Sequence, residues 1–374
     1  MLTGSDTIEY NWTMSQKRID VSAPGRLCLL GEHQDYFGLP VIAAAIDLRV
    51  SIQGAPWSHR SFHLDLPDIN DTEELLLDEK LTYGRERDYL KSAVNILQRE
   101  GTVFPSGWDC RIHGTIPINS GTSSSSALVV AWVKFLLEAS GDTRALIPEK
   151  IAELAYRAEV AEFKEPGGRM DHYTSALGGI VALDFKDPIQ AQILPNPLGP
   201  FVLADSFIRK DTTGTLGHIK QGVWEGLKIA QAKLPGFTLY GAVEELIEMI
   251  PKRNPEGNLR LLRGTFRTRD LTRRGRELFA AEPFDHSAFG ELLLNQQSVL
   301  REDLRVSLPK LDRMIETAME AGGLGAKING SGEGGCIFAY APASAEEVAE
   351  ALRHLDTRAD IVHIDSGVQS NDSE

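Results

Sequence analysis

A serine-rich segment, Pro117 to Ala127, has the residue types of an anion-binding loop. It contains Gly121 followed by Thr122 and four serines, and it lies between an expected strand and an expected helix. A helix N-terminus exposes unpaired N–H groups and partial positive charge, which together favour a phosphate. The serine hydroxyls could add hydrogen bonds or bind a metal that accompanies a nucleotide. The alternative is a serine-rich helix cap without a ligand, and the Walker A pattern is absent.

A second glycine-rich loop runs from Lys327 to Cys336 and has four glycines in six residues. Glycine at this density loses much conformational entropy on folding. It is therefore typical of a backbone that turns tightly or approaches a ligand closely. A long turn into the strand expected at 336–341 is the alternative interpretation.

A cluster of polar residues, Glu32-His33-Gln34-Asp35, ends the buried strand expected before Gly31. Carboxylates accept hydrogen bonds from O–H groups and imidazole can donate or accept, so the cluster suits the hydroxyls of a sugar. A metal site is less favoured because the spacing lacks the helical i, i+4 geometry of the common zinc motif. An ordinary polar turn remains an alternative.

An acidic pair, Glu159 and Asp171, flanks the segment Gly167-Gly168-Arg169-Met170. An aspartate after a Gly-Gly turn is commonly a helix N-cap. The functional interpretation is that Asp171 is a general base beside a substrate hydroxyl.

The elements that must position these residues are mixed helices and strands, which predicts an α/β or α+β protein. Helices are expected over 87–100, 123–139, 148–162, 215–234, 240–249, 257–278, 286–301, 308–322 and 345–354. Strands are expected over 19–31, 41–52 (as a pair), 109–118, 180–185, 201–205, 336–341 and 360–364. Three prolines between 195 and 200 indicate a boundary between domains at 1–195 and 196–374. The polar tail after Gly367 is expected to fray.

Composition limits the class of partner. The chain has 374 residues, 42% hydrophobic and 25% charged, with a net charge of −14. Such acidity disfavours nucleic acid and anionic membranes, and the apolar runs are too short to span a bilayer. Three scattered cysteines indicate neither a disulfide framework nor a zinc site. The basic segment 252–276 is interpreted as a solvated amphipathic helix. We therefore expect a cytoplasmic protein with a small-molecule partner, as a monomer or weak homo-oligomer.

In their order along the chain, these segments resemble the GHMP kinases and, within them, the galactokinases. Residues 25–36 resemble the galactokinase signature, 117–126 the ATP-binding loop, 159–171 the metal and base segment, and 327–336 the third family motif. The resemblance spans about residues 20–341. It implies an α+β fold of two domains. These are an N-terminal α/β domain of the ribosomal S5 domain 2 type and a ferredoxin-like C-terminal domain.

The resemblance also implies phosphoryl transfer from Mg·ATP to a sugar hydroxyl, most simply the C1 hydroxyl of galactose. Asp171 would take or orient the hydroxyl proton, and Arg26 would keep Asp171 ionised and offset charge on the transferring group. Ser124 and Glu159 would hold Mg²⁺. The sugar would be bound by Glu32, His33, Asp35 and Gly168. ATP would be bound by Ser120, Gly121, Thr122, Ser123, Ser124, Ser125, Gly330, Gly332 and Gly334.

Departures from the family pattern lie near the expected sugar site. They are Gln34 for threonine, Phe37-Gly38-Leu39 for Asn-Gly-Gly, Arg169 within the base segment, His172 for glutamine, and Thr215 near the place of a sugar-contacting tyrosine. N-acetylgalactosamine, arabinose or a uronic acid therefore remain alternative substrates, and Arg169 motivates the uronic acid. A non-catalytic sugar sensor is disfavoured by the intact serine loop with Arg26 and Asp171. A mevalonate-type kinase is disfavoured by the polar cluster at 32–35.

Overall fold

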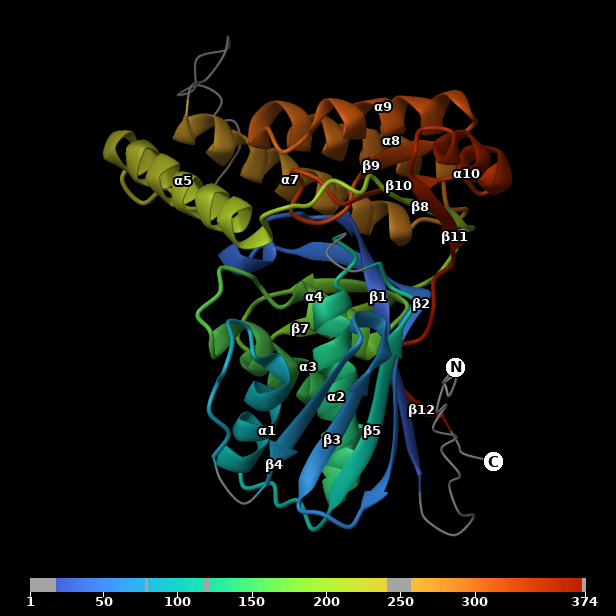
Figure 1. Cartoon of the computed structure of the whole chain (residues 1–374). Coiled ribbons are helices and arrows are strands. Elements are labelled where there is room, and N and C mark those ends of the chain that lie inside the picture. Colours follow the sequence, from blue (N-terminus) through green and yellow to red (C-terminus); the bar gives the residue numbers. More distant parts are fainter. Residues whose placement is uncertain (1–17, 78–79, 118–120, 241–256, 372–374) are drawn as a thin grey trace, which may run out of the picture.

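The computed structural model describes residues 18–77, 80–117, 121–240 and 257–371. Two β-sheets organise these residues, and each carries its own helices (Figure 1). The larger, eight-stranded sheet has the order β12-β1-β2-β5-β3-β4, and β6 and β7 extend from β2. Its strands are β1 (Ile19–Leu30), β2 (Val41–Trp57), β3 (Ser61–Leu66), β4 (Asp71–Leu76), β5 (Gly107–Gly114), β6 (Ile180–Asp184), β7 (Gln190–Leu194) and β12 (Gln369–Asn371).

Strand β2 is the longest strand described, and it holds the larger sheet together. One end pairs with β6, the other end pairs with β5, and β1 pairs along most of its length. The expected strand pair at 41–52 is therefore wrong, because this apolar run continues as one strand to Trp57. Strands β3 and β4 were not expected from the sequence.

Helix α2 (Ser124–Ser140) is central to the N-terminal domain. It is buried on nearly all sides, with Trp132 and Phe135 fully enclosed, as expected for a helix that is apolar all round. It contacts β1, β2, α1 (Tyr89–Arg99), α3 (Pro148–Tyr156) and α4 (Met170–Leu177). The serine-rich loop lies at its N-terminus, so the packed core fixes the position of that loop.

The smaller sheet has the order β11-β8-β10-β9 and is antiparallel throughout. Numbered along the chain, this is the 4-1-3-2 order of a ferredoxin-like unit, so the fold expected for the C-terminal domain is confirmed. Its strands are β8 (Phe201–Asp205), β9 (Gly325–Ile328), β10 (Cys336–Tyr340) and β11 (Arg358–Val362). Its helices are α5 (Thr212–Lys233), α7 (Asn258–Phe279), α8 (His286–Ser298), α9 (Pro309–Glu320) and α10 (Ala345–Arg353).

After β11 the chain returns to the larger sheet. Strand β12 pairs with β1 through Gln369, Ser370 and Asn371. Arg49 of β2 donates to the carboxylate of Asp365 and to the following backbone carbonyls. The expectation of a frayed tail after Gly367 is therefore wrong for 369–371, because this segment completes the edge of the larger sheet.

Other expectations have mixed outcomes. The helix expected at 240–249 falls almost wholly in 241–256, outside the described residues. The basic segment forms helix α7 from residue 258 onward. No helix in the described part of the chain is long and apolar enough to cross a membrane. Cys28, Cys110 and Cys336 are buried free thiols.

Candidate active site

A buried ion pair forms the centre of the site. Arg26, near the middle of β1, donates from Nε to Oδ1 of Asp171 at 2.8 Å and from Nη2 to Oδ2 at 2.9 Å. Asp171 lies in the first turn of α4, and Arg26 is only 4% exposed. Burial raises the pKa of Asp171, but the charge and hydrogen bonds of Arg26 outweigh it, so the pKa lies below its ordinary value. Asp171 is therefore ionised at neutral pH.

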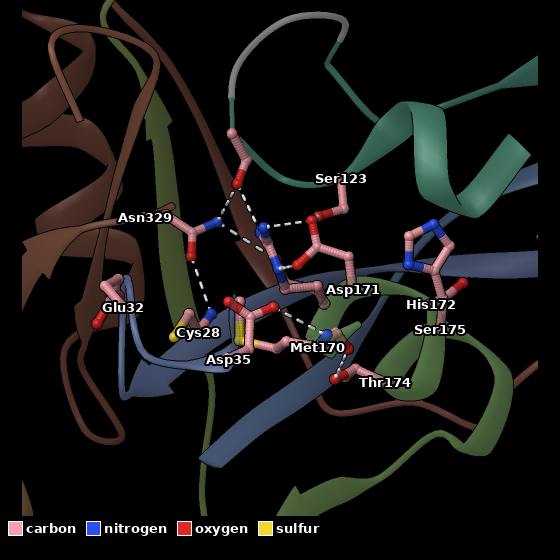
Figure 2. A network of polar contacts seen from close by, with 12 residues as sticks. Cys28, Glu32, Asp35, Ser123, Met170, Asp171, His172, Thr174, Ser175 and Asn329 are labelled. Atoms are coloured by element: carbon pink, nitrogen blue, oxygen red, sulfur yellow. Dashed lines mark hydrogen bonds and ion pairs between the residues drawn. The ribbon is translucent and has the colours of Figure 1, made fainter. Parts of the chain in front are cut away.

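Ser123 is turned toward this ion pair instead of capping α2. Its backbone is left-handed, with φ 60° and ψ 41°, and its side chain makes no cap hydrogen bond. The hydroxyl donates to Oδ2 of Asp171 (Figure 2). The helix-cap interpretation is therefore wrong for Ser123, and the structure adds contact with the expected base to its predicted role at the nucleotide.

Asn329, at the start of the second glycine-rich loop, ties that loop to the serine-rich loop. Its Nδ2 donates to the carbonyls of Gly121 and Arg26 at 3.0 and 3.2 Å, and its Oδ1 accepts from the N–H of Cys28. Arg26 also donates from Nη1 to the Gly121 carbonyl at 2.6 Å. The two loops, distant in sequence, therefore lie side by side around the ion pair (Figure 2).

A cavity of about 430 Å³ opens between the domains, a size suited to a small-molecule ligand. Of the predicted ATP-binding residues, Gly121, Ser123, Ser124, Ser125 and Gly330 line it. Ser120 lies outside the described residues.

Three predicted ATP contacts are absent from the cavity wall. Thr122 is fully buried, and its carbonyl accepts from the N–H of Arg26. A Cβ on Gly332 would lie 2.5 Å from Val306, and one on Gly334 would lie 2.6 Å from the carbonyl of Ile208. Thr122, Gly332 and Gly334 therefore pack the loops against the protein, and their nucleotide contacts stay predictions.

The expected sugar-binding residues lie beside Asp171. Asp35 accepts from the N–H of Tyr36 at 2.9 Å and from the N–H of Met170 at 3.1 Å. Burial, and then the nearby charge of Asp171, raise the pKa of Asp35 to about 6. Gly168 leaves room for this carboxylate, since an added Cβ would lie 2.1 Å from its Oδ2.

Glu32 and His33 also line the cavity but are nearly enclosed. Glu32 forms a buried ion pair with Lys327 of β9, and its Oε2 has no hydrogen-bond partner among the described residues. His33 contacts the Tyr36 hydroxyl through Nδ1 at 2.9 Å and the Ser331 carbonyl through Nε2 at 3.2 Å. Burial lowers the pKa of His33 to about 4, so its imidazole is neutral at neutral pH.

Glu159 lies in a π-helical turn, Arg157–Ala161, a local form often found at functional sites. Its Oε2 pairs with Nε2 of His172 at 2.7 Å, and both side chains are buried. Glu159 and Ser124 both line the cavity. Within the described ranges, no three His, Cys, Asp or Glu side chains converge as a metal-binding group. The Ser124 hydroxyl and the Glu159 carboxylate are both oxygen donors, the ligand type that Mg²⁺ takes.

The departures from the family pattern have different locations. Arg169 pairs with Glu153 at 3.0 Å and lies 4.0 Å over the ring of Tyr156, away from the cavity wall. Thr215 contacts the carboxylate of Glu333. Phe37 is buried, and its ring packs against Tyr36 and Trp224.

Several residues of the cavity wall were missed by sequence reasoning. Lys210 lies between β8 and α5 and faces both loops. Arg87 reaches from the N-terminal domain to the hydroxyl of Thr213 on α5 and pairs with Glu165. An apolar part of the wall is formed by Val50, Leu66, Ile69, Ile112, Ile116 and Leu128. No sequence pattern separates these apolar residues from ordinary core residues.

Comparison with known proteins gives the family. The GHMP kinases N terminal domain matches residues 88–179, the GHMP kinases C terminal domain matches 276–356, and the galactokinase galactose-binding signature matches 10–56. Galactokinase of Actinobacillus succinogenes is 29% identical over 90% of this chain and 88% of its own length. Mevalonate kinase of Thermococcus sibiricus is also 29% identical, over 90% of this chain and 93% of its own.

Solved structures show the same fold. Lactococcus lactis galactokinase complexed with galactose has a TM-score of 0.80 at 24% identity, covering 94% of this chain and 95% of its own. Methanococcus jannaschii mevalonate kinase has a TM-score of 0.69 at 19% identity, and the match covers 94% of this chain and 99% of the mevalonate kinase. Together the three matched regions span more than half of the sequence, and they include the ion pair and both loops. The chain belongs to the GHMP kinase family and is an ATP-dependent sugar kinase of the galactokinase-like type.

Proposed function

We propose that this kinase transfers the γ-phosphoryl group of Mg·ATP to the C1 hydroxyl of galactose. The observation that carries the proposal is the ionised Asp171, held by Arg26 and Ser123 next to Asp35 and Gly168. One end of the cavity therefore offers a proton acceptor beside carboxylates suited to hydroxyls. The galactose-binding signature over residues 10–56 and the galactokinase relatives support galactose among the sugars.

The contacts of Asp171 support a role as the acceptor of the hydroxyl proton. Among the described residues, Oδ2 accepts from Arg26 and Ser123, whereas Oδ1 accepts from Arg26 alone, which leaves a lone pair for the sugar hydroxyl. The bond between the sugar oxygen and the γ-phosphorus forms while the bond from that phosphorus to the β–γ bridging oxygen breaks. The hydroxyl proton passes to Asp171 and ADP leaves. Because phosphoryl transfer depends mainly on positioning and charge, a carboxylate of low pKa suffices to orient the hydroxyl.

Nucleotide binding is assigned to the part of the cavity formed by α2 and the apolar wall. The N-terminus of α2, with Ser124 and Ser125, faces the cavity and suits the phosphates. The apolar wall that includes Ile112 and Leu128 suits the adenine base. Ser124 and the second carboxylate oxygen of Glu159 would hold Mg²⁺, which neutralises phosphate charge when bound.

The alternative acceptors differ in their support. The position of Arg169, paired with Glu153 outside the cavity, removes the reason to favour a uronic acid. Mevalonate is a competing acceptor because mevalonate kinase relatives cover the chain equally well. The polar groups of Glu32, His33 and Asp35 favour a polyol over it.

The test is ADP release with a panel of acceptors. Galactose is expected to give the highest kcat/KM, ahead of N-acetylgalactosamine, arabinose, galacturonate and mevalonate. Asp171→Ala is expected to lower galactose-dependent ADP release by about 10²- to 10⁴-fold, while Arg169→Ala leaves the order of acceptors unchanged. Galactose turnover no better than that of arabinose or galacturonate would contradict the assignment. No ADP release with any acceptor would favour a non-catalytic sensor.

A further inference from the structure

Lys210 brings an ammonium group from the C-terminal domain to the meeting point of the two loops. It lies between β8 and α5, and its side chain lines the cavity. A Cβ added to Gly121 would lie 2.6 Å from its Nζ, and one added to Gly330 would lie 3.7 Å away. The ammonium therefore occupies the space that the missing side chains of these glycines leave.

The charge of Lys210 has no partner in the part of the chain that the structure describes. No hydrogen bond or ion pair to Nζ is formed there, and among the surrounding charges the like charge of Arg26 has the largest effect on its pKa, ahead of the opposite charges of Asp171 and Asp205. Burial, and then Arg26, lower the pKa of Lys210 to about 8. An unpaired cation is costly in such a place, so an anion bound between the two loops would relieve a cost that the free protein carries.

Arg26 is less available for this role, because three of its five N–H donors are directed into the protein. Nε and Nη2 bind Asp171, Nη1 binds the Gly121 carbonyl, and the side chain is almost fully buried. The resemblance to the family implies that Arg26 also offsets charge on the transferring group. In this structure Arg26 is hydrogen-bonded to the expected base Asp171. The N–H groups of Lys210 have no partner among the described residues and can bind a ligand.

We propose that Lys210 binds the terminal phosphate of ATP and carries its charge during transfer. This inference deepens the proposed function, on which it rests for the identity of the nucleotide. The ammonium would contact the γ-phosphate oxygens between the loops of Gly121 and Gly330. Lys210 thereby adds a charged C-terminal-domain contact to a phosphate site built by α2, its preceding loop and the loop of Gly330.

The decisive measurement compares nucleotides that differ in the γ-phosphate. Lys210→Met in the full chain is expected to weaken Mg·ATP by about 10- to 100-fold, with Mg·ADP changed less than about 3-fold, by isothermal titration calorimetry. Lys210→Arg should keep most of the affinity for Mg·ATP. Lys228→Met, which removes an exposed lysine of α5, is the matched control and should behave as wild type. Equal weakening of Mg·ATP and Mg·ADP, or no weakening of either, would overturn the proposal.

A second measurement uses the wild-type protein and does not depend on the folding of Lys210→Met. Since binding an anion stabilises the protonated ammonium, affinity for Mg·ATP should fall as pH rises through about 8, and more steeply than affinity for Mg·ADP. The titratable groups that interact with Nζ are Arg26 on β1, His33, Asp171 on α4, Asp205 on β8 and the thiol of Cys336 on β10. Lys210→Arg retains all of them and should lose the pH effect. A pH dependence unchanged in Lys210→Arg would contradict the role of Lys210.

Failure of this inference can be told from failure of the proposed function. If galactose is phosphorylated but Lys210→Met binds Mg·ATP as wild type does, the assignment of Lys210 alone is wrong. If no acceptor is phosphorylated and Lys210→Met still loses Mg·ATP selectively, the phosphate contact holds and the acceptor assignment is wrong.

Discussion

Replacing Gly168 by alanine tests whether Asp35 is held where the sugar binds. A Cβ at this position would lie 2.1 Å from Oδ2 of Asp35 and 2.2 Å from its Cγ. The carboxylate must therefore move by about 1 Å to reach an ordinary contact distance. That movement breaks or weakens its 3.1 Å hydrogen bond with the N–H of Met170, at a cost of about 1 kcal/mol in the free energy of unfolding.

The effect on catalysis should be larger than the effect on stability. A displacement of about 1 Å in a positioning group can cost about 10²-fold in rate, so we expect kcat/KM for the sugar to fall by about that factor. Binding of Mg·ATP, measured by calorimetry, should change little, because the phosphate loops are elsewhere. Gly167→Ala is the matched control, since its Cβ would lie 3.7 Å from Val160. Sugar kinetics of Gly168→Ala within about 3-fold of Gly167→Ala would refute the placement of Asp35 at the sugar.

Two further predictions concern charged groups of the site. Because the pKa of Asp35 is raised to about 6, Asp35 gains a proton as pH falls through that value and can no longer accept from sugar hydroxyls through both oxygens. The KM for the sugar should therefore rise below about pH 6 in steady-state assays, and Asp35→Asn should show a high KM without this dependence. Lys327→Met leaves Glu32 buried without its cation and should cost about 3–5 kcal/mol in the free energy of unfolding at neutral pH. Burial then raises the pKa of Glu32, so the folded state of this variant binds the proton more tightly than the unfolded state does. The loss in the free energy of unfolding, measured by urea denaturation, should therefore shrink as pH falls toward about 5. A loss that grows at low pH would contradict this pairing.

Much of the site could be predicted from local sequence because its chemistry is concentrated in short segments. The serine-rich loop and the 32–35 cluster each follow or precede an element with a clear apolar pattern, whereas helix α4, which carries Asp171, was not expected from the sequence. That pattern places them at element ends, where a cavity can form. Arg26 could be matched to Asp171 only through the family resemblance, since the two are 145 residues apart in the chain.

The remaining features depend on contacts that no local pattern encodes. The direction of the Ser123 side chain follows from its left-handed backbone, which is set by packing of the loop against β1. Gly332 and Gly334 look like Gly330 in sequence, yet only Gly330 faces the cavity, because the other two approach Val306 and Ile208. Lys210 is a single lysine after a strand, and its importance arises from two loops far away in the sequence.

The pairing of β12 with β1 has a consequence for how the protein is synthesised. Strand β1 carries Arg26, and β12 covers its otherwise open edge at Asp20, Val21 and Ser22. On the ribosome, β1 therefore lacks this edge partner until residue 371 has emerged, although the other strands of the larger sheet are made within the first 200 residues. Until then β1 presents unpaired backbone groups that invite pairing with another chain. A bulky fusion placed directly after 371 would act on the strand of Arg26, so an affinity tag is better joined through a long linker.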